Sequence, residues 1–170
     1  MSDATTIIRQ ANEGEALWFA GGGTWAIKAT GQETGGAFFL AEDRVVRGKT
    51  TPMHLHANED ESIYVLEGEI VVHVDGEEHT VRERGFVFFP RGVAHAFLVT
   101  SETAHLLVWQ TPATGESFYR EVTEPARSAK DSSRPPDFAR LREAAERSPS
   151  IDIIGPPPFA VARDTAAAQS

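Results

Sequence analysis

The chain has 170 residues, a formal net charge of −9 and no cysteine. This length is enough for one domain with a hydrophobic core. The negative charge argues against nucleic acid or an anionic membrane surface as a partner. Without cysteine, any metal must be held by histidine and carboxylate. The first residues lack a signal-peptide pattern and no apolar run could span a bilayer, so we expect a cytoplasmic protein.

An N-terminal arm over residues 1–16 precedes a segment, residues 17–123, with the pattern of a β domain. Short runs rich in Val, Ile, Phe, Trp and Thr are separated there by Gly, Pro, Asp and Asn. The expected strands cover residues 18–20, 24–30, 36–45, 51–56, 61–74, 77–85, 86–90, 95–100 and 104–111. Asp75-Gly76 predicts a two-residue hairpin, because both turn positions need a positive φ. Many short strands without intervening helices predict an all-β sandwich or small barrel.

Residues 124–170 have a different character and are expected to form a linker, a helix and a proline-rich tail. The helix is predicted over residues 137–147, where Phe138, Leu141 and Ala145 recur at helical spacing and would pack on the barrel. The apolar, proline-rich residues 151–160 are expected to lie extended along the barrel or along a partner subunit. Residues 163–170 are expected to fray.

Three histidines and one glutamate form a candidate metal site. His54 and His56 are two residues apart in an expected strand, so their side chains share one face. Glu61 begins the next apolar run, and His95 opens a later strand. This set of nitrogen and oxygen donors suits one divalent transition metal per chain, whether Ni, Mn, Fe, Co, Cu or Zn. The sequence does not distinguish among these metals.

The spacing of these residues resembles the first cupin motif. Gly48, five residues, His54-Leu55-His56, four residues, Glu61, six residues and Gly68 match it position for position. The segment "GFVFFPRGVAHAF" is similar to the second motif, with Pro90, Gly92 and His95 in place. It departs at Arg84-Gly85, where the motif has a glycine followed by an acid, and at Val99, where it has Asn. The resemblance implies a cupin barrel (a double-stranded β-helix or jelly roll) with His54, His56, Glu61 and His95 as metal ligands, commonly paired as a homodimer.

Other histidines and carboxylates are expected to lie outside the metal site. Glu59 and Asp60 precede Glu61, but only Glu61 keeps the spacing to Gly68, so the other two are expected to solvate a loop. The remaining histidines are expected at the surface near the hairpin or in a late strand outside the ligand set: His73, His79 and His105.

The substrate pocket follows from strand alternation. If His95 faces inward, so do Phe97 and Val99, and if Glu61 faces inward, so do Ile63 and Val65. An apolar, partly aromatic cavity beside a metal suits a flat aromatic small molecule.

Three functions remain open. The flanking segments "ATGQETGGAFFLAEDRV" and "TPATGESFYREVTEPA" resemble single-cupin proteins of the quercetin 2,3-dioxygenase-like group. That resemblance implies a metal-dependent dioxygenase that opens a flavonol-like or other metal-chelating aromatic enol with dioxygen, with Glu61 as both ligand and catalytic base. The alternatives are another cupin enzyme (an isomerase, decarboxylase or cyclase) and a non-enzymatic cupin that binds a small molecule.

Overall fold

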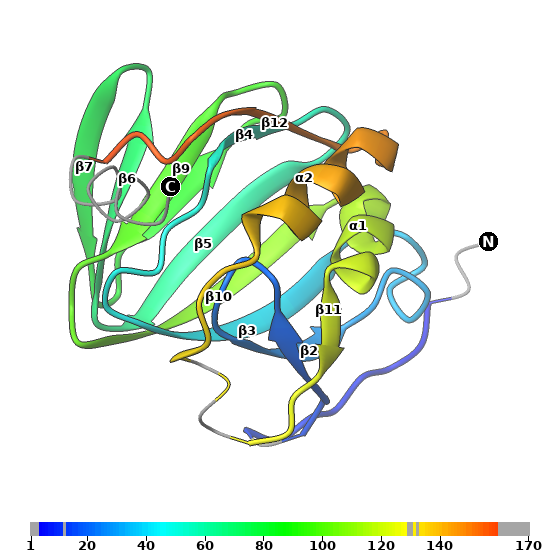
Figure 1. Ribbon diagram of the computed structural model, residues 1–170. Helices are drawn as coiled ribbons and strands as arrows, with labels where there is room; N and C mark the ends of the chain where they lie inside the picture. Colours follow the sequence, from blue (N-terminus) through cyan, green and yellow to red (C-terminus); the bar gives the residue numbers. More distant parts are fainter. Residues whose placement is uncertain (1–3, 12, 129–130, 132, 160–170) are drawn as a thin grey trace.

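The computed structural model describes residues 4–11, 13–128, 131 and 133–159. Most of its regular structure lies in two antiparallel sheets (Figure 1). This arrangement is a jelly-roll cupin barrel and confirms the expected all-β fold class. None of the helices in the described ranges is long and apolar enough to cross a membrane.

The larger sheet contains seven strands in the order β11-β1-β2-β3-β10-β5-β8. In that order their bounds are Thr123–Pro125, Glu15–Phe19, Thr24–Ala29, Phe39–Val46, Thr103–Thr111, Asp60–Glu67 and Phe86–Phe89. The smaller sheet contains five strands in the order β12-β4-β9-β6-β7. Their bounds are Ile151–Gly155, Met53–His56, His95–Val99, Glu69–Val74 and Glu77–Arg82.

The expected strand over residues 61–74 is in fact two strands. Glu67 ends β5 in the larger sheet, and Glu69 begins β6 in the smaller sheet. Gly68 separates them with φ of 86°, a left-handed conformation that glycine adopts at little cost. The single apolar run therefore crosses from one wall of the barrel to the other.

The Asp75-Gly76 hairpin is confirmed. Asp75 has φ of 53° and Gly76 has φ of 80°, as a turn with two left-handed positions requires. Val74 of β6 then pairs with Glu77 of β7 across the turn.

The core has two hydrophobic clusters. One lies between the two sheets and includes Val65, Ile70 and Val99. The other gathers aromatic residues of the first strands, among them Trp25, around the helices. Burying each of these side chains stabilises the fold by roughly 1.5–3 kcal/mol.

Helices pack at one end of the barrel (Figure 1). A 3-10 turn, η1 (Ala113–Gly115), leads into α1 (Glu116–Glu121), and neither was expected from the sequence. The expected helix is confirmed as α2 (Phe138–Arg147), where the Asp137 side chain caps the first turn by accepting from Arg140 N. Leu141 and Ala145 are buried in the aromatic cluster.

The chain after α2 becomes part of the smaller sheet. β12 pairs with β4, placing Ile151 opposite His56 and Ile153 opposite His54. The extended segment expected over residues 151–160 is therefore an edge strand of the barrel itself as far as Gly155. The segment expected to fray, residues 163–170, lies outside the described residues.

Candidate metal centre

The two sheets each contribute to one group of potential metal donors. His54 and His56 project from β4, and His54 is the register partner of His95 on β9. Glu61 projects from β5 in the opposite sheet. One donor atom from each of these four buried residues lies within 4.8 Å of the others. The structure therefore brings together the four residues that the motif spacing selected.

Each imidazole is held through its Nδ1 atom. His54 Nδ1 lies 2.9 Å from the carbonyl oxygen of Pro52, and His95 Nδ1 lies 2.9 Å from that of Val93. A carbonyl only accepts, so Nδ1 carries the proton and Nε2 keeps a free lone pair. His56 Nδ1 lies 3.1 Å from the Glu59 carboxylate. With each Nδ1 held in this way, Nε2 is the ring atom left to bind a metal.

The buried donor atoms fit a divalent cation. His56 Nε2 is buried and has no hydrogen-bond partner among the described residues. His95 Nε2 lies 3.0 Å and His56 Nε2 lies 3.6 Å from the two oxygens of Glu61. Three neutral imidazoles and one carboxylate in a buried site are a donor set that binds first-row transition metals.

Electrostatics favour the ligating forms of His54 and Glu61. Burial would lower the pKa of His56, but the carboxylates of Glu61 and Glu59 outweigh it and raise that pKa. Burial, together with the neighbouring imidazoles of His95 and His56, lowers the pKa of His54 from 6.5 to about 3. Burial alone would raise the pKa of Glu61, but the surrounding imidazoles outweigh it and bring that pKa below its usual range. At neutral pH, His54 is therefore uncharged and Glu61 is ionised.

Glu59 corrects one expectation, because it does not solvate a loop. Its side chain is fully buried, and its second oxygen accepts a 2.7 Å hydrogen bond from Thr114 Oγ1 in η1. Gly115 makes this approach possible, since a Cβ there would overlap Glu59 Oε1. Glu59 thus orients the His56 ring, whereas the neighbouring Asp60 forms a 3.0 Å ion pair with Arg91.

Gln110 and Tyr119 also belong to the site and were missed. Gln110 on β10 is the register partner of Glu61, and its Nε2 donates across 3.3 Å to Glu61 Oε1 and also to the Tyr119 hydroxyl. Strand alternation contained a signal for Gln110, which shares the inward face with Leu106 and Val108. Tyr119 gave no such signal, because its position depends on α1.

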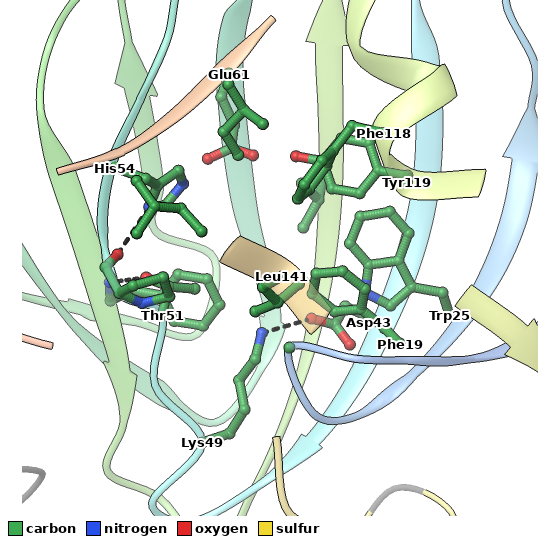
Figure 2. A pocket seen from close by; sticks show the side chains of 16 residues that line it. Phe19, Trp25, Asp43, Lys49, Thr51, His54, Glu61, Phe118, Tyr119 and Leu141 are labelled. Atoms are coloured by element: carbon green, nitrogen blue, oxygen red, sulfur yellow. Dashed lines mark hydrogen bonds and ion pairs between the residues drawn. The ribbon is translucent and has the colours of Figure 1, made fainter. Parts of the chain in front are cut away.

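A cavity of about 50 Å³ extends from the donor group into the aromatic cluster. Figure 2 shows His54 and Glu61 at one end and a wall of aromatic rings beside them. Sixteen residues line this cavity: Phe19, Gly21, Trp25, Asp43, Lys49, Thr51, Pro52, His54, Glu61, Phe97, Val108, Phe118, Tyr119, Leu141, Ile151 and Ile153.

The expected pocket lining is only partly reproduced. Phe97 lines the cavity, but Ile63, Val65 and Val99 do not and instead pack in the cluster between the sheets. Strand alternation places them on the inner face of the barrel. It does not say which inward-facing residues border the cavity, and these three are not among those that do.

The remaining histidines lie outside the donor group. His105 Nε2 lies 3.2 Å from Glu42 on the neighbouring strand. His79 is exposed, and His73 is partly buried with its ring edge toward Phe159.

Comparison with known proteins agrees with the fold and the site. Residues 43–110, which contain all four donors, match the family model described as "Cupin domain". The matched segment belongs to the cupin superfamily. The cupin is 25% identical over 122 residues to quercetin 2,3-dioxygenase of Bacillus subtilis (strain 168), a match that covers 72% of this chain and 36% of that enzyme. The chain spans half or less of the length of the curated relatives it matches.

Two solved structures show the same fold. An RmlC-like cupin from Shewanella frigidimarina NCIMB 400 superposes with a TM-score of 0.58 at 19% identity, covering 69% of this cupin and 99% of that chain. A predicted oxalate decarboxylase from Thermotoga maritima gives a TM-score of 0.56 at 20% identity, with 63% and 99% covered. At these identities the likeness concerns the fold alone.

Proposed function

We propose that this cupin is a metal-dependent dioxygenase of the quercetin 2,3-dioxygenase type, acting on a flavonol-like or other metal-chelating aromatic enol. One observation carries the proposal: a single cavity joins two of the metal donors to a wall of aromatic rings. The similarity to the Bacillus subtilis enzyme over 72% of the chain supports it. His54, His56, Glu61 and His95 would hold the ion. When bound, a divalent metal lowers the pKa of a coordinated hydroxyl and orients both reactants.

Glu61 is the proposed catalytic base. It is ionised and buried, and it lines the cavity, so it can accept the proton of a substrate hydroxyl. Gln110 donates to Oε1 of the same carboxylate and fixes its orientation. Burial favours this transfer, because the Glu61 side chain is only 5% exposed and is largely shielded from bulk water.

The aromatic wall would orient the substrate. Trp25 and Tyr119 have ring centroids 4.8 Å apart with their planes 27° from parallel, and both line the cavity. The two rings stack on each other and together form a rigid apolar border of the cavity. An aromatic border of this kind supports an aromatic substrate.

The volume of the cavity limits the size of the substrate that can enter. A three-ring flavonol is several times larger than about 50 Å³. Leu141, Ile151 and Ile153 form one wall and belong to α2 and β12. We infer that a flavonol would be admitted by outward movement of this wall.

The same volume favours a second candidate function. A small metal-chelated enol needs less additional space than a flavonol does. We therefore keep an isomerase, decarboxylase or cyclase reaction on a small enol as the alternative to the dioxygenase.

Oxygen uptake tests the proposal. Metal-loaded protein mixed with quercetin should shift the flavonol absorption band and consume dioxygen, while chelator-stripped protein should do neither. An unshifted band would remove flavonols as the substrate class. Turnover of a small enol without oxygen uptake would favour the alternative enzyme, and binding of the ligand without turnover would favour a non-enzymatic role.

We also propose a cytoplasmic homodimer. Phe86 and Phe88 are 54% and 51% exposed on β8, the edge strand of the larger sheet. An apolar edge of this kind is commonly covered by a second chain. Sedimentation should give a dimer that becomes monomeric on Phe86→Asp with Phe88→Asp, and a monomeric unsubstituted protein would contradict the proposal.

A further inference from the structure

A buried ion pair lies at the end of the cavity opposite Glu61 (Figure 2). Lys49 Nζ lies 3.2 Å from Asp43 Oδ2, and the two side chains are only 4% and 1% exposed. Both residues line the cavity. The proposed reaction uses neither of them. Removing an ion pair from water costs free energy. A buried pair that lines a cavity therefore suggests a role in binding the ligand.

Main-chain contacts hold the pair in place. Asp43 on β3 is the register partner of Trp25 on β2, so both side chains project from the same face of the larger sheet. Lys49 follows β3 in a tight turn, where its N–H donates to Val46 and its carbonyl accepts from Val99 N. The lysine side chain is thereby directed into the barrel.

The Lys49 ammonium has donor capacity that the pair does not use. It carries three N–H groups, and Asp43 is its hydrogen-bond partner within the described ranges. The Phe97 ring centroid lies 4.3 Å from Nζ, and the Phe19 centroid lies 5.7 Å away. Aromatic faces stabilise a cation more weakly than an oxygen acceptor does at short range. The ammonium therefore offers a donor to any oxygen that enters this end.

The net charge of the ion pair indicates which kind of ligand oxygen would accept a hydrogen bond from Lys49. Lys49 and Asp43 are together neutral. A ligand carboxylate would meet the Asp43 charge in a dry site, where repulsion is strong. An uncharged hydroxyl or carbonyl oxygen accepts from Lys49 without that penalty.

We propose that Lys49 is a specificity-determining residue that donates a hydrogen bond to an uncharged hydroxyl or carbonyl oxygen of the aromatic ligand, at the end of the cavity away from the metal donors. This inference deepens the proposed function and rests on it for the identity of the ligand as an aromatic enol. It adds that the ligand carries a second oxygen, beyond those that chelate the ion.

Two flavonols that share one chelating group test the inference. Quercetin and 3-hydroxyflavone both present the 3-hydroxy-4-oxo pair, but only quercetin carries hydroxyls on its outer rings. Titration calorimetry with metal-loaded protein should show quercetin binding about 10- to 100-fold more tightly, as expected for a hydrogen bond to a charged donor. The variant Asp43→Leu with Lys49→Met should bind both flavonols with similar affinity.

The double substitution is chosen so that the protein still folds. Removing Lys49 alone would leave the Asp43 charge buried and unpaired, which is strongly destabilising, whereas replacing both charges by apolar groups is often neutral. The matched control is Lys28→Met with Glu42→Leu. This control removes the ion pair between Lys28 and Glu42, whose charged atoms lie 3.5 Å apart. Glu42 precedes Asp43 in β3 and faces the other side of the sheet. The control variant should keep the preference for quercetin.

A second probe separates this inference from the proposed function. Phenol should shift the side-chain NMR signals of Lys49 at lower concentration than benzene, with no flavonol present. Failure of both flavonols to bind would remove flavonols as the substrate class of the proposed function, and the phenol comparison would then decide the role of Lys49. A quercetin preference that survives in the double variant, or phenol binding no better than benzene, would overturn the inference.

Discussion

Glu59 Oε1 lies 3.1 Å from His56 Nδ1, so the first acid of the cluster "EDE" holds a histidine whose Nε2 faces the metal donors. The last acid, Glu61, is itself one of those donors. Two carboxylates separated by one residue thus serve the same centre in different ways. Asp60 between them points to Arg91 instead.

Replacing Glu59 by Ala should weaken metal binding. His56 would lose the acceptor that fixes its ring, and loss of such a partner typically lowers metal affinity by about 10- to 100-fold. Competition with a chelator of known affinity measures the change. Asp60→Ala is the control: it removes the neighbouring carboxylate, which pairs with Arg91. It should change the metal affinity by no more than a few-fold. Equal affinities of the two variants would show that Glu59 has no role at the centre.

Replacing His54 and His56 together by Ala should abolish metal binding. Only Glu61 and His95 would remain from the buried group of four, too few donors for a stable site. Metal analysis of protein purified without chelator should give about one ion per chain before the substitution and none after it. His73→Ala is the control, because His73 lies outside the donor group, and it should retain full occupancy. Full occupancy in the double variant would refute the assignment.

Glu61→Gln should separate metal binding from turnover. The amide keeps a weak oxygen donor but cannot accept the substrate proton, and loss of a general base typically lowers the rate by about 10²–10⁴-fold. The rate of flavonol consumption should be measured at matched metal content, together with that of Glu67→Gln at the end of β5. If the Glu61 variant is as active as the Glu67 variant, Glu61 is not the base.

Leu141→Ala should destabilise the protein and enlarge the cavity. Leu141 is buried where α2 closes the cavity, and removing such a side chain typically costs about 2–5 kcal/mol of unfolding free energy. Denaturant titration measures this loss. Ile154→Ala on β12, where the side chain is 55% exposed, should change stability by no more than about 0.5 kcal/mol. If α2 is the wall that limits entry, the Leu141 variant should also bind flavonols faster than the unsubstituted protein does.

The sequence by itself predicted most of the barrel strands, the hairpin and the four residues of the donor group, but not the break at Gly68 or the strands β11 and β12. Alternation along β4 places His54 and His56 on one face wherever the strand lies, because a strand has a period of two residues. The spacing from His56 to Glu61 and Gly68 identified which of three acids belongs to the donor group. These features depend on local backbone geometry and on residues close together in the chain.

Only the tertiary structure decided what surrounds the donors. Glu59 is buried because Thr114 and Gly115, more than fifty residues later, cover it. The cavity is bordered by Lys49 and Asp43 and also by α2 and β12, which fold back over the barrel and form one of its walls. Such contacts join segments far apart in the chain, and their free energy depends on the packing of whole surfaces. No local pattern of residue types encodes which surfaces will meet.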